Sequence, residues 1–402
     1  MNIVSLAVKG LQHKPLHTTL SILATMMGMA MLTAVFLISN GISDGLKRNS
    51  GGIDVVAGAK GSPLQLILST VYHSDVPIGN IDISDYDSLR RNPMVKQAIP
   101  IVVGDNFKGW RVVGTTPEFL NLYQARFAEG NIFSQPFEVV AGANTDVKIG
   151  EKFAARHGFA ADSDDVHDFH LYKVVGRLAP TGTVIDRLLM TPYVSVQQLH
   201  AHLDEDEKDG PEAETELAMA HQVTAILIKA RNGAAVMNLP RVINHHDKMQ
   251  AANPGYELAR LSKSFGIGRD VLNALGLSIL ILSVLMLFST LASSLTERRH
   301  DMAVLRVLGA SPAKLFATLM IEGVLVAAAG TGAGIICGHI LAYSLTGLLG
   351  SFEGIVANGD FLLPHAFDAI LLAVGCGAGM LAALPAAISA ARTDIARLLV
   401  KG

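Results

Sequence analysis

Charged residues are scarce in this chain: they make up 17% of its 402 residues, whereas hydrophobic residues make up 50%. A soluble protein usually carries about 25% charged residues, so the deficit excludes an ordinary soluble protein. The shortage is concentrated in runs with no Asp, Glu, Lys or Arg, at 15–43, 271–296, 323–352 and 369–391. Each run exceeds the roughly 20 residues that an α-helix needs to cross the hydrocarbon core. The sequence therefore predicts an integral membrane protein with four spans.

Cysteine and catalytic motifs are also scarce. Cys337 and Cys376 both fall inside predicted spans, so we expect no disulfide in the segment between the first two spans. The chain lacks the G-x-x-x-x-G-K-[ST] phosphate loop and the H-E-x-x-H zinc motif. We therefore expect no enzymatic activity and no cofactor in this chain itself. Its formal net charge of −3 argues against a nucleic-acid partner.

Basic residues beside the spans predict the orientation, because segments rich in Lys and Arg stay in the cytoplasm. These residues are Lys9 and Lys14 before the first span, Arg298, Arg299, Arg306 and Lys314 between the second and third, and Arg392, Arg397 and Lys401 after the fourth. The loop between the third and fourth spans, at 350–367, has no Lys or Arg. Both termini are therefore expected in the cytoplasm, and the long segment 41–270 outside.

These observations divide the chain into an ordered series of segments. We expect a cytoplasmic amphipathic helix at 1–17, a first span at 18–40, an extracytoplasmic domain at 41–270, a second span at 271–293, a cytoplasmic helix at 294–314, a third span at 315–348, a short outer loop at 349–367, a fourth span at 368–391 and a cytoplasmic tail at 392–402. The apolar part of the first span is longer than the roughly 7–15 residues of a signal-peptide core. We therefore expect this span to be retained.

The segment 41–270 has the pattern of a folded α+β domain of roughly 200 residues, which is large enough to bury its own core. Short runs rich in Val, Ile and aromatic residues predict strands at 97–105, 110–115, 137–142, 171–178, 187–196 and 223–230. Helices are expected between them, at 84–91 with Ser84 as N-cap, at 117–124 and at 240–250. The fold class is thus a four-helix membrane protein with a large α+β domain inserted between the first two spans.

Two stretches of this domain have an unusual composition. The acidic run DEDEKDGPEAETE at 204–216 is expected to be a solvated loop, because like charges repel one another. The apolar run SPLQLILSTVY at 62–72 is expected in the core, since apolar residues are usually buried. The alternative for the second run is an apolar patch that meets a greasy substrate near the membrane.

Small residues recur at a spacing of four in the last two spans, at Gly330, Gly334 and Gly338 and at Gly375 and Gly379. Such residues allow the backbones of two helices to approach closely in lipid, so we expect close packing against another span. Glu322 lies about two turns into the third span. An ionisable side chain at that depth is expected to face protein or water and not lipid.

The stretch SSLTERRHDMAVLRVLGASPAKL, residues 293–315, mixes charged and apolar residues between the second and third spans. Neither Gly nor Pro occurs between Glu297 and Gly309, which favours a continuous helix. Gly309 is typical of a helix end, and Ser311 followed by Pro312 is typical of a helix start. A connection that only reverses the chain needs about 4–6 residues. The longer amphipathic helix therefore indicates a docking element, the alternative being a helix that rests on lipid headgroups.

This stretch resembles a known family. The sequence ERRHDMAVLRVLGASPAKL (297–315) is similar to the E-R-x-x-E-I-G-x-L-R-A-L-G-A-S segment of FtsX-like, MacB-type ABC transporter permeases. KPLHTTLSILATMMGMAMLTAVFLI (14–38) resembles the first span of that family, and LAALPAAISAARTDIARLLV (381–400) resembles its last span and tail. The resemblance implies a multi-pass protein of the inner membrane, with a porter-and-sabre-like outer domain, that transmits movement across the membrane (mechanotransmission).

Carried over by position, the resemblance assigns an ATPase-coupling helix to Glu297, Arg298, Asp301, Met302, Leu305, Arg306, Gly309 and Ala310. It implies two copies of a separate cytoplasmic ABC ATPase, which would bind ATP and Mg²⁺, and a homodimer or heterodimer of permeases. The sequence departs from the family pattern in having Asp301 in place of Glu, Ala303 in place of Gly and Ile395 in place of Pro. These departures preserve the helix but leave the choice of ATPase open.

The resemblance predicts a permease subunit that exports or extracts a lipoprotein, peptide, lipid or drug-like molecule, with a periplasmic, lipoprotein or outer-membrane partner as a further expectation. Two alternatives remain, a permease of a zinc-handling system and a membrane regulator that signals without transport. Histidines of the outer domain would supply imidazoles for zinc, namely His73, His157, His167, His170, His200, His202, His221, His245 and His246. Because they form no closed ligand set in the sequence, we assign no metal ligand among them.

Overall fold

The computed structural model describes residues 3–13, 15–158, 170–201, 221–297, 299–348 and 361–392. The chain divides into two compact units. The first, the helical unit, comprises Met1–Asn40, Phe265–Leu348 and Asp360–Gly402. The second, the α+β unit, comprises Gly41–Ser264. The acidic run 204–216 lies outside the described residues.

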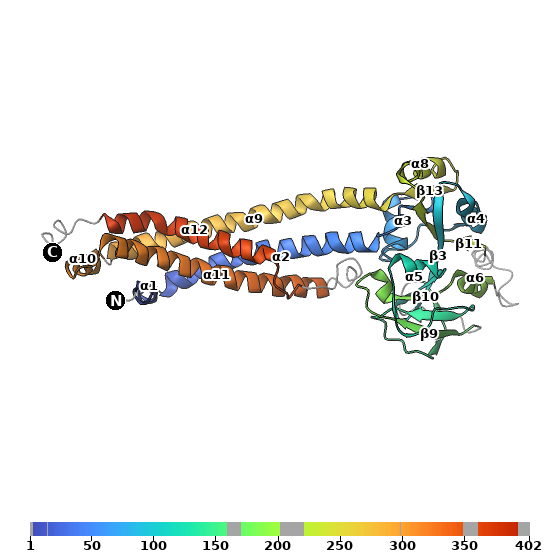
Figure 1. Ribbon diagram of the computed structural model, residues 1–402, viewed down its shortest axis with the longest axis horizontal. Helices are drawn as coiled ribbons and strands as arrows, with labels where there is room; N and C mark the ends of the chain where they lie inside the picture. Colours follow the sequence, from blue (N-terminus) through green and yellow to red (C-terminus); the bar gives the residue numbers. More distant parts are fainter. Residues whose placement is uncertain are drawn as a thin grey trace. The chain divides into compact units, whose positions relative to one another are not determined.

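The helical unit is built from long apolar helices (Figure 1). Its helices are α1 (Ile3–Gln12), α2 (Pro15–Asn49), α9 (Pro254–Glu297), α10 (Arg299–Val307), α11 (Pro312–Leu348) and α12 (Ala366–Ala391). Four of them, α2, α9, α11 and α12, are long and apolar enough to cross a membrane, which confirms the prediction of four spans. The boundary between the units falls within α2 and α9, so each of these helices contributes residues to both units.

The α+β unit is organised around one mixed sheet. Its strands are β1 (Val55–Ala59), β3 (Val95–Phe107), β4 (Trp110–Thr115), β5 (Phe127–Gly130), β6 (Glu138–Ala141), β9 (Tyr172–Leu178), β10 (Leu188–Pro192), β12 (Ala225–Ala230) and β13 (Met249–Ala252), in the order β13-β1-β12-β3-β4-β10-β6-β9-β5. Short strands β7 (Lys152–Phe153) and β8 (Arg156–His157) pair with β9 and β3, and β2 (Ile81–Asp82) pairs with β11 (Gln222–Val223). Strand β3 is bulged between Val103 and Asp105.

The helices of the α+β unit are α3 (Pro63–Thr70), α4 (Ile83–Arg91), α5 (Glu118–Leu122), α6 (Tyr193–Ala201), α8 (Gly233–Ile243) and the 3₁₀ helix η1 (Val184–Arg187). The run 62–72 contains α3, and Leu66 and Ile67 are at most 2% exposed, so its predicted place in the core is confirmed. The six predicted strands are all present as β3, β4, β6, β9, β10 and β12.

Three local predictions were wrong, each because a neighbouring contact decides the boundary. Helix α4 is capped by Asp82, whose Oδ1 accepts a hydrogen bond from the backbone N–H of Ser84 at 2.7 Å, so Ser84 is not the N-cap. The run 187–196 leaves the sheet at Pro192 and continues as α6. The helix predicted at 240–250 is misplaced: α8 runs from Gly233 to Ile243, and Met249 and Gln250 belong to β13 because they pair with β1.

Glycines bring the helices of the helical unit into backbone contact. A Cβ atom added to Gly334 of α11 would lie 2.7 Å from both the carbonyl oxygen of Met26 and Cβ of Met29 in α2. Cβ atoms essentially never approach other atoms that closely. Gly330 and Gly338 meet α2 in the same way. The predicted close packing is thus present, and α2 is the partner helix.

The opposite face of α11 packs against α12. A Cβ atom on Gly379 would lie 2.5 Å from Cβ of Ala327 and 2.7 Å from the carbonyl oxygen of Gly323. A Cβ atom on Gly375 would lie 2.0 Å from Oγ1 of Thr331. Helix α11 therefore uses one face for α2 and another for α12, and small residues on both faces make the contacts.

Polar and small side chains join α2 to α9. Oγ1 of Thr25 and Oγ of Ser283 lie 2.5 Å apart in a hydrogen bond that is buried between the two helices. A Cβ atom on Gly28 of α2 would lie 3.1 Å from the backbone nitrogen of Leu280. In a hydrocarbon environment, close backbone packing and hydrogen bonds between helices supply the cohesion that the hydrophobic effect supplies in water.

The last turn of α2 is anchored in the core of the α+β unit. The hydroxyl groups of Tyr72 and Tyr123 donate hydrogen bonds to the backbone carbonyls of Leu46 (3.0 Å) and Asn49 (3.3 Å). Oδ1 of Asn49 accepts a hydrogen bond from the backbone N–H of Val184 at 2.7 Å. Burial raises the pKa of both tyrosines, so both hydroxyls keep their protons and remain donors. The end of α2 is therefore an integral part of this core.

His73 is a buried histidine in the same unit. It is 7% exposed, adopts a positive φ of 48°, and neither ring nitrogen has a hydrogen-bond partner among the described residues. Burial, reinforced by the nearby charge of Arg111, lowers the pKa of His73 from 6.5 to about 3. The folded protein therefore holds this imidazole in its neutral form.

We predict that Gly334→Ala destabilises the helical unit, whereas Gly332→Ala does not. The first substitution forces Cβ against backbone atoms of α2 that cannot move aside, and overpacking of this kind costs about 1–3 kcal/mol. Gly332 lies on the same helix with no atom within 4 Å of an added Cβ, so its variant is the matched control. Thermal unfolding of the purified chain in detergent, followed by helical circular dichroism, should show a lower midpoint for Gly334→Ala alone. Equal midpoints would contradict the close α2–α11 contact.

We also predict that His73→Asn makes the α+β unit less sensitive to acid. Asparagine tolerates positive φ and does not titrate. In the native chain, the unfolded state binds a proton below about pH 6.5 while the folded state does not until about pH 3. The contribution of His73 to stability is thus fully present above pH 6.5 and is lost as the pH falls through that window.

Urea unfolding followed by fluorescence of the single tryptophan, Trp110 in β4, reports on this unit alone. The native chain should lose more stability than His73→Asn between neutral pH and about pH 4. The matched control is His245→Asn, because His245 is exposed; it should retain the native pH dependence. Identical slopes for the native chain and His73→Asn would contradict the buried neutral imidazole.

Candidate functional site

The candidate site is the connection between α9 and α11, which contains the short helix α10. Helix α10 ends in a glycine-dependent turn: the backbone N–H of Ala310 bonds to the carbonyl of Leu305 at 2.9 Å, and that of Gly309 bonds to the carbonyl of Arg306 at 3.1 Å. Gly309 has φ +93°, a conformation that favours glycine. These bonds form a Schellman motif, which satisfies carbonyl groups at the helix end. The turn fixes the direction in which the chain leaves α10.

The next helix begins as the sequence predicts. Oγ of Ser311 accepts a hydrogen bond from the backbone N–H of Lys314 at 3.3 Å, and Pro312 is the first residue of α11. Only a few residues therefore separate α10 from α11. With the glycine turn on one side and the serine cap on the other, α10 is held in a defined orientation on the end of α11.

One side of α10 anchors it to the helical unit. Met302 is 5% exposed and belongs to a cluster with Leu295, Leu315, Leu319, Ala387 and Ala390, against which Leu305 also packs. This cluster joins α10 to residues of α9, α11 and α12. Met302 and Leu305, both assigned to the ATPase contact by resemblance, therefore face the helices of their own chain.

The other side of α10 presents apolar residues to the surroundings. Val304, Val307 and Leu308 are 42%, 63% and 78% exposed, and they recur at the spacing of one helical face. Arg306 beside them is half-buried, and its Nη1 has no hydrogen-bond partner within the described chain. We refer to Val304, Val307 and Leu308 as the exposed face of α10. An exposed apolar face of this kind is typical of a protein contact.

A groove lies between this connection and α1. It has a volume of about 230 Å³ and is lined by Ile3 and Leu6 of α1 together with Leu305, Leu308, Gly309, Ala310, Lys314, Leu315 and Thr318. Helix α1 is held in place through Ala7, which is fully buried. The amphipathic N-terminal helix predicted at the membrane surface therefore also contacts the candidate site.

The remaining predicted site residues are placed as follows. Glu297 is the exposed last residue of α9. Arg298 lies outside the described residues, and the side chain of Asp301 is not described. Gly309 and Ala310 form the turn that lines the groove. Glu322 is 1% exposed within the helical unit, as expected for a carboxyl group that avoids lipid.

The sequence did not predict that Val304, Val307 and Leu308 form the exposed face of α10. Met302 and Leu305 form one apolar stripe, and Val304, Val307 and Leu308 form a second at the same helical spacing. Periodicity alone cannot tell which stripe packs inward. A tertiary contact decides which stripe packs inward, because Leu315 and Leu319 of α11 lie against Met302.

The histidines of the outer segment offer no three-ligand metal group in the part of the chain that the structure describes. His73 is buried without a hydrogen-bond partner there, and Nδ1 of His157 lies 3.7 Å from Oδ1 of buried Asp105. His170 stacks on Phe137 with ring centroids 4.6 Å apart. His167 and His202 lie outside the described residues, and the side chain of His200 is not described.

Comparison with known proteins places both parts of the chain in recognised families. Residues 18–240 match the MacB-like periplasmic core domain, and residues 273–395 match the FtsX-like permease C-terminal domain. The macrolide export ATP-binding/permease protein MacB of Syntrophobacter fumaroxidans is 22% identical over 92% of this chain and 59% of its own length. The lipoprotein-releasing system transmembrane protein LolC of Neisseria meningitidis is 36% identical over 17% of each chain.

An uncharacterised ABC transporter permease of Mycobacterium tuberculosis is 31% identical over 30% of this chain and 15% of its own length. This chain thus spans between 15% and 59% of the length of these relatives. Among solved structures, the periplasmic region of MacB from Actinobacillus actinomycetemcomitans is 12% identical and covers 54% of this chain and 97% of that chain, with a TM-score of 0.34.

We predict that a charge destabilises the protein when it is placed on the inner side of α10 but not when it is placed on the exposed face. Met302→Asp puts a carboxylate into the cluster that anchors α10 and should lower the thermal midpoint, since removing an isolated charge from water costs several kcal/mol. Leu308→Asp changes a residue that is 78% exposed and should leave the midpoint unchanged. Thermal unfolding in detergent measures both. Equal destabilisation by the two variants would contradict the assigned inner and outer sides of α10.

Proposed function

Because the chain belongs to the family of ABC transporter permeases with a MacB-like periplasmic core domain and an FtsX-like C-terminal domain, we propose that it couples ATP hydrolysis by a separate cytoplasmic ATPase to movement of its α+β unit. The observation that carries this proposal is the exposed apolar face of α10, held in a fixed orientation between two membrane-spanning helices. The chain itself is a multi-pass protein of the inner membrane.

Helix α10 has the properties of a docking element for such an ATPase. Its Met302 side is anchored in the helical unit, and its Val304, Val307 and Leu308 side is exposed. An amphipathic helix that lays an apolar face into a groove is a common mode of protein recognition. Force applied to the exposed face would pass into α9, α11 and α12 through the cluster around Met302.

The long helices offer a route to the other side of the membrane. Helix α9 has 44 residues, which gives a length of about 66 Å at about 1.5 Å per residue. The hydrocarbon core is only about 30 Å thick, so a large part of α9 extends beyond it. Near its start, Leu258 is 7% exposed and belongs to the same core cluster as Leu46 of α2. One end of each of these helices, α2 and α9, is thus buried in the core of the α+β unit.

The proposal includes the orientation and the assembly of the complex. The basic flanks favour a cytoplasmic location for both termini and for α10, and an outer location for the α+β unit. We propose two copies of the ATPase, one for each permease of a homodimer or heterodimer, with ATP and Mg²⁺ bound by the ATPase.

The substrate class follows from similarity alone. Two relatives are named for macrolide export and for lipoprotein release. We therefore propose that this permease handles a lipoprotein, peptide, lipid or drug-like molecule on the outer side of the membrane, together with a periplasmic, lipoprotein or outer-membrane partner.

We predict that Leu308→Asp and Arg306→Glu abolish stimulation of the partner ATPase by the reconstituted chain. Leu308→Asp places a charge on the exposed face of α10, where docking would have to bury it without a partner. The matched control is Met237→Asp, because Met237 of α8 is 76% exposed but belongs to the α+β unit. ATPase rates should be measured in lipid nanodiscs with and without each variant. Full stimulation by Leu308→Asp, or equal loss with Met237→Asp, would refute docking through α10.

A further inference from the structure

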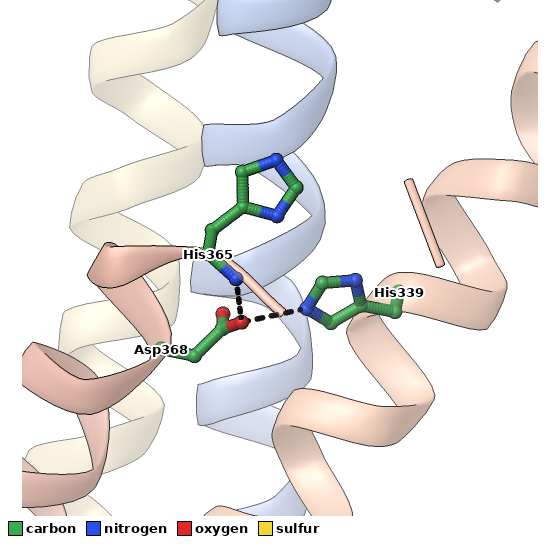
Figure 2. Close-up of side chains that lie close together, drawn as sticks. All are labelled: His339, His365 and Asp368. Carbon is green, nitrogen blue, oxygen red and sulfur yellow. Dashed lines mark hydrogen bonds and ion pairs between the residues drawn. The ribbon is translucent and has the colours of Figure 1, made fainter. Parts of the chain in front are cut away.

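A cluster of metal-ligating side chains lies where α11 and the start of α12 meet. His339 comes from α11, His365 directly precedes α12, and Asp368 lies in the first turn of α12 (Figure 2). One ligand atom from each of the three residues lies within 4.8 Å of the others. It is the one three-residue group of potential metal ligands in the part of the chain that the structure describes. Coupling to an ATPase through α10 does not account for it.

The tautomer of His339 is fixed by a backbone contact. Its Nδ1 contacts the carbonyl oxygen of Phe361, and a carbonyl can only accept, so Nδ1 carries the proton. The neutral ring then has a lone pair on Nε2, which lies 3.2 Å from Oδ2 of Asp368. Two lone pairs that face each other repel, so either a proton or a cation must lie between these atoms.

The geometry fits a cation as well as a proton. Zinc binds imidazole nitrogen and carboxylate oxygen at about 2.0–2.2 Å in a tetrahedral arrangement, which separates neighbouring ligand atoms by about 3.3–3.5 Å. The observed 3.2 Å between Nε2 of His339 and Oδ2 of Asp368 is close to that separation. In metal sites, the second ring nitrogen of a ligating histidine typically donates to a backbone carbonyl or carboxylate. The contact between His339 and Phe361 is of this kind.

Two further atoms of the cluster are buried without a hydrogen-bond partner among the described residues: Nδ1 of His365 and Oδ1 of Asp368. Oδ2 of Asp368 also accepts the backbone N–H of His365 at 2.7 Å, which orients the carboxylate toward the other two residues. The side chains of His339 and Asp368 are 10% and 14% exposed, so the cluster is largely shielded from water. Buried polar atoms without partners are rare in folded proteins.

We propose that His339, His365 and Asp368 form a binding site for a divalent transition-metal ion of the zinc class. Two imidazoles and one carboxylate suit Zn²⁺ and its neighbours, whereas Mg²⁺ and Ca²⁺ prefer oxygen ligands alone. Three protein ligands leave one coordination position open for water or a further ligand. The bound ion would join α11 to the start of α12 at the end of α11 that is farthest in sequence from α10.

The test uses the full-length chain in detergent, stripped of metal by a chelator. Zn²⁺ affinity is measured by competition with a chromogenic chelator, and Co²⁺ serves as a spectroscopic probe of tetrahedral coordination. The main variant is His365→Ala, because it removes one ligand while the His339 contacts and the backbone bond to Asp368 persist. His339→Ala is the second variant. The matched control is the double substitution His245→Ala and His246→Ala, which removes two exposed histidines of the α+β unit.

We expect one Zn²⁺ per chain and a tetrahedral Co²⁺ spectrum for the native chain and for the control. Loss of second-shell partners alone typically weakens metal binding by about 10–100-fold, so each ligand variant should weaken it by at least about 100-fold. Zn²⁺ should raise the thermal midpoint of the native chain but not that of His365→Ala.

Three outcomes would overturn the site. The first is the absence of stoichiometric Zn²⁺ binding by the native chain, and the second is unchanged affinity in both ligand variants. In either case the cluster would be a hydrogen-bonded clamp between α11 and α12 only. The third is a sulfur-to-cobalt charge-transfer band, which would assign the metal to Cys337 or Cys376.

Discussion

Backbone contact along both faces of α11 is the constraint on which the helical unit depends. Lipid tails are as apolar as leucine, so helices in a membrane gain little from burying large side chains against one another. Glycine, alanine and threonine on α11 allow α2 and α12 to approach until a single Cβ atom would collide with backbone. Because α10 is attached to α11 by a glycine turn and a serine cap, this packing also fixes where α10 lies.

The same constraint explains how a short helix could act at a distance. The cluster around Met302 ties α10 to α9, α11 and α12, and the hydroxyls of Thr25 and Ser283 tie α9 to α2. The far ends of α2 and α9 are then buried in the core of the α+β unit, through Leu46 and Leu258. Protein interiors have low compressibility and transmit strain, which is the physical basis of the proposed coupling.

Much of the fold could be predicted from the sequence because its signals are strong in a membrane. Runs without charge gave the four spans, and Gly309 with Ser311 and Pro312 marked the turn between α10 and α11. The spacing of Gly330, Gly334 and Gly338 indicated a close contact but could not name α2 as the partner, because small residues on one helix do not specify which helix packs against them.

The parts that could not be predicted depend on tertiary contacts. Two apolar stripes on α10 have the same helical spacing, and only the position of Leu315 and Leu319 shows that Met302 faces inward. His339 and Asp368 are separated by 29 positions, and each looks ordinary in isolation. These two residues and His365 lie together only because α11 packs on α12, so no local sequence motif predicts the cluster.

The account requires α10 and the α+β unit to lie on opposite sides of the membrane. The most direct measurement is labelling of single cysteines in sealed inner-membrane vesicles of known orientation, in a chain whose Cys337 and Cys376 are replaced by serine. One cysteine replaces Leu308 on α10, and the other replaces Val76, which is 53% exposed in the α+β unit. The account predicts that a membrane-impermeant maleimide modifies position 308 only from the cytoplasmic side and position 76 only from the other side. Modification of both positions from the same side would contradict it.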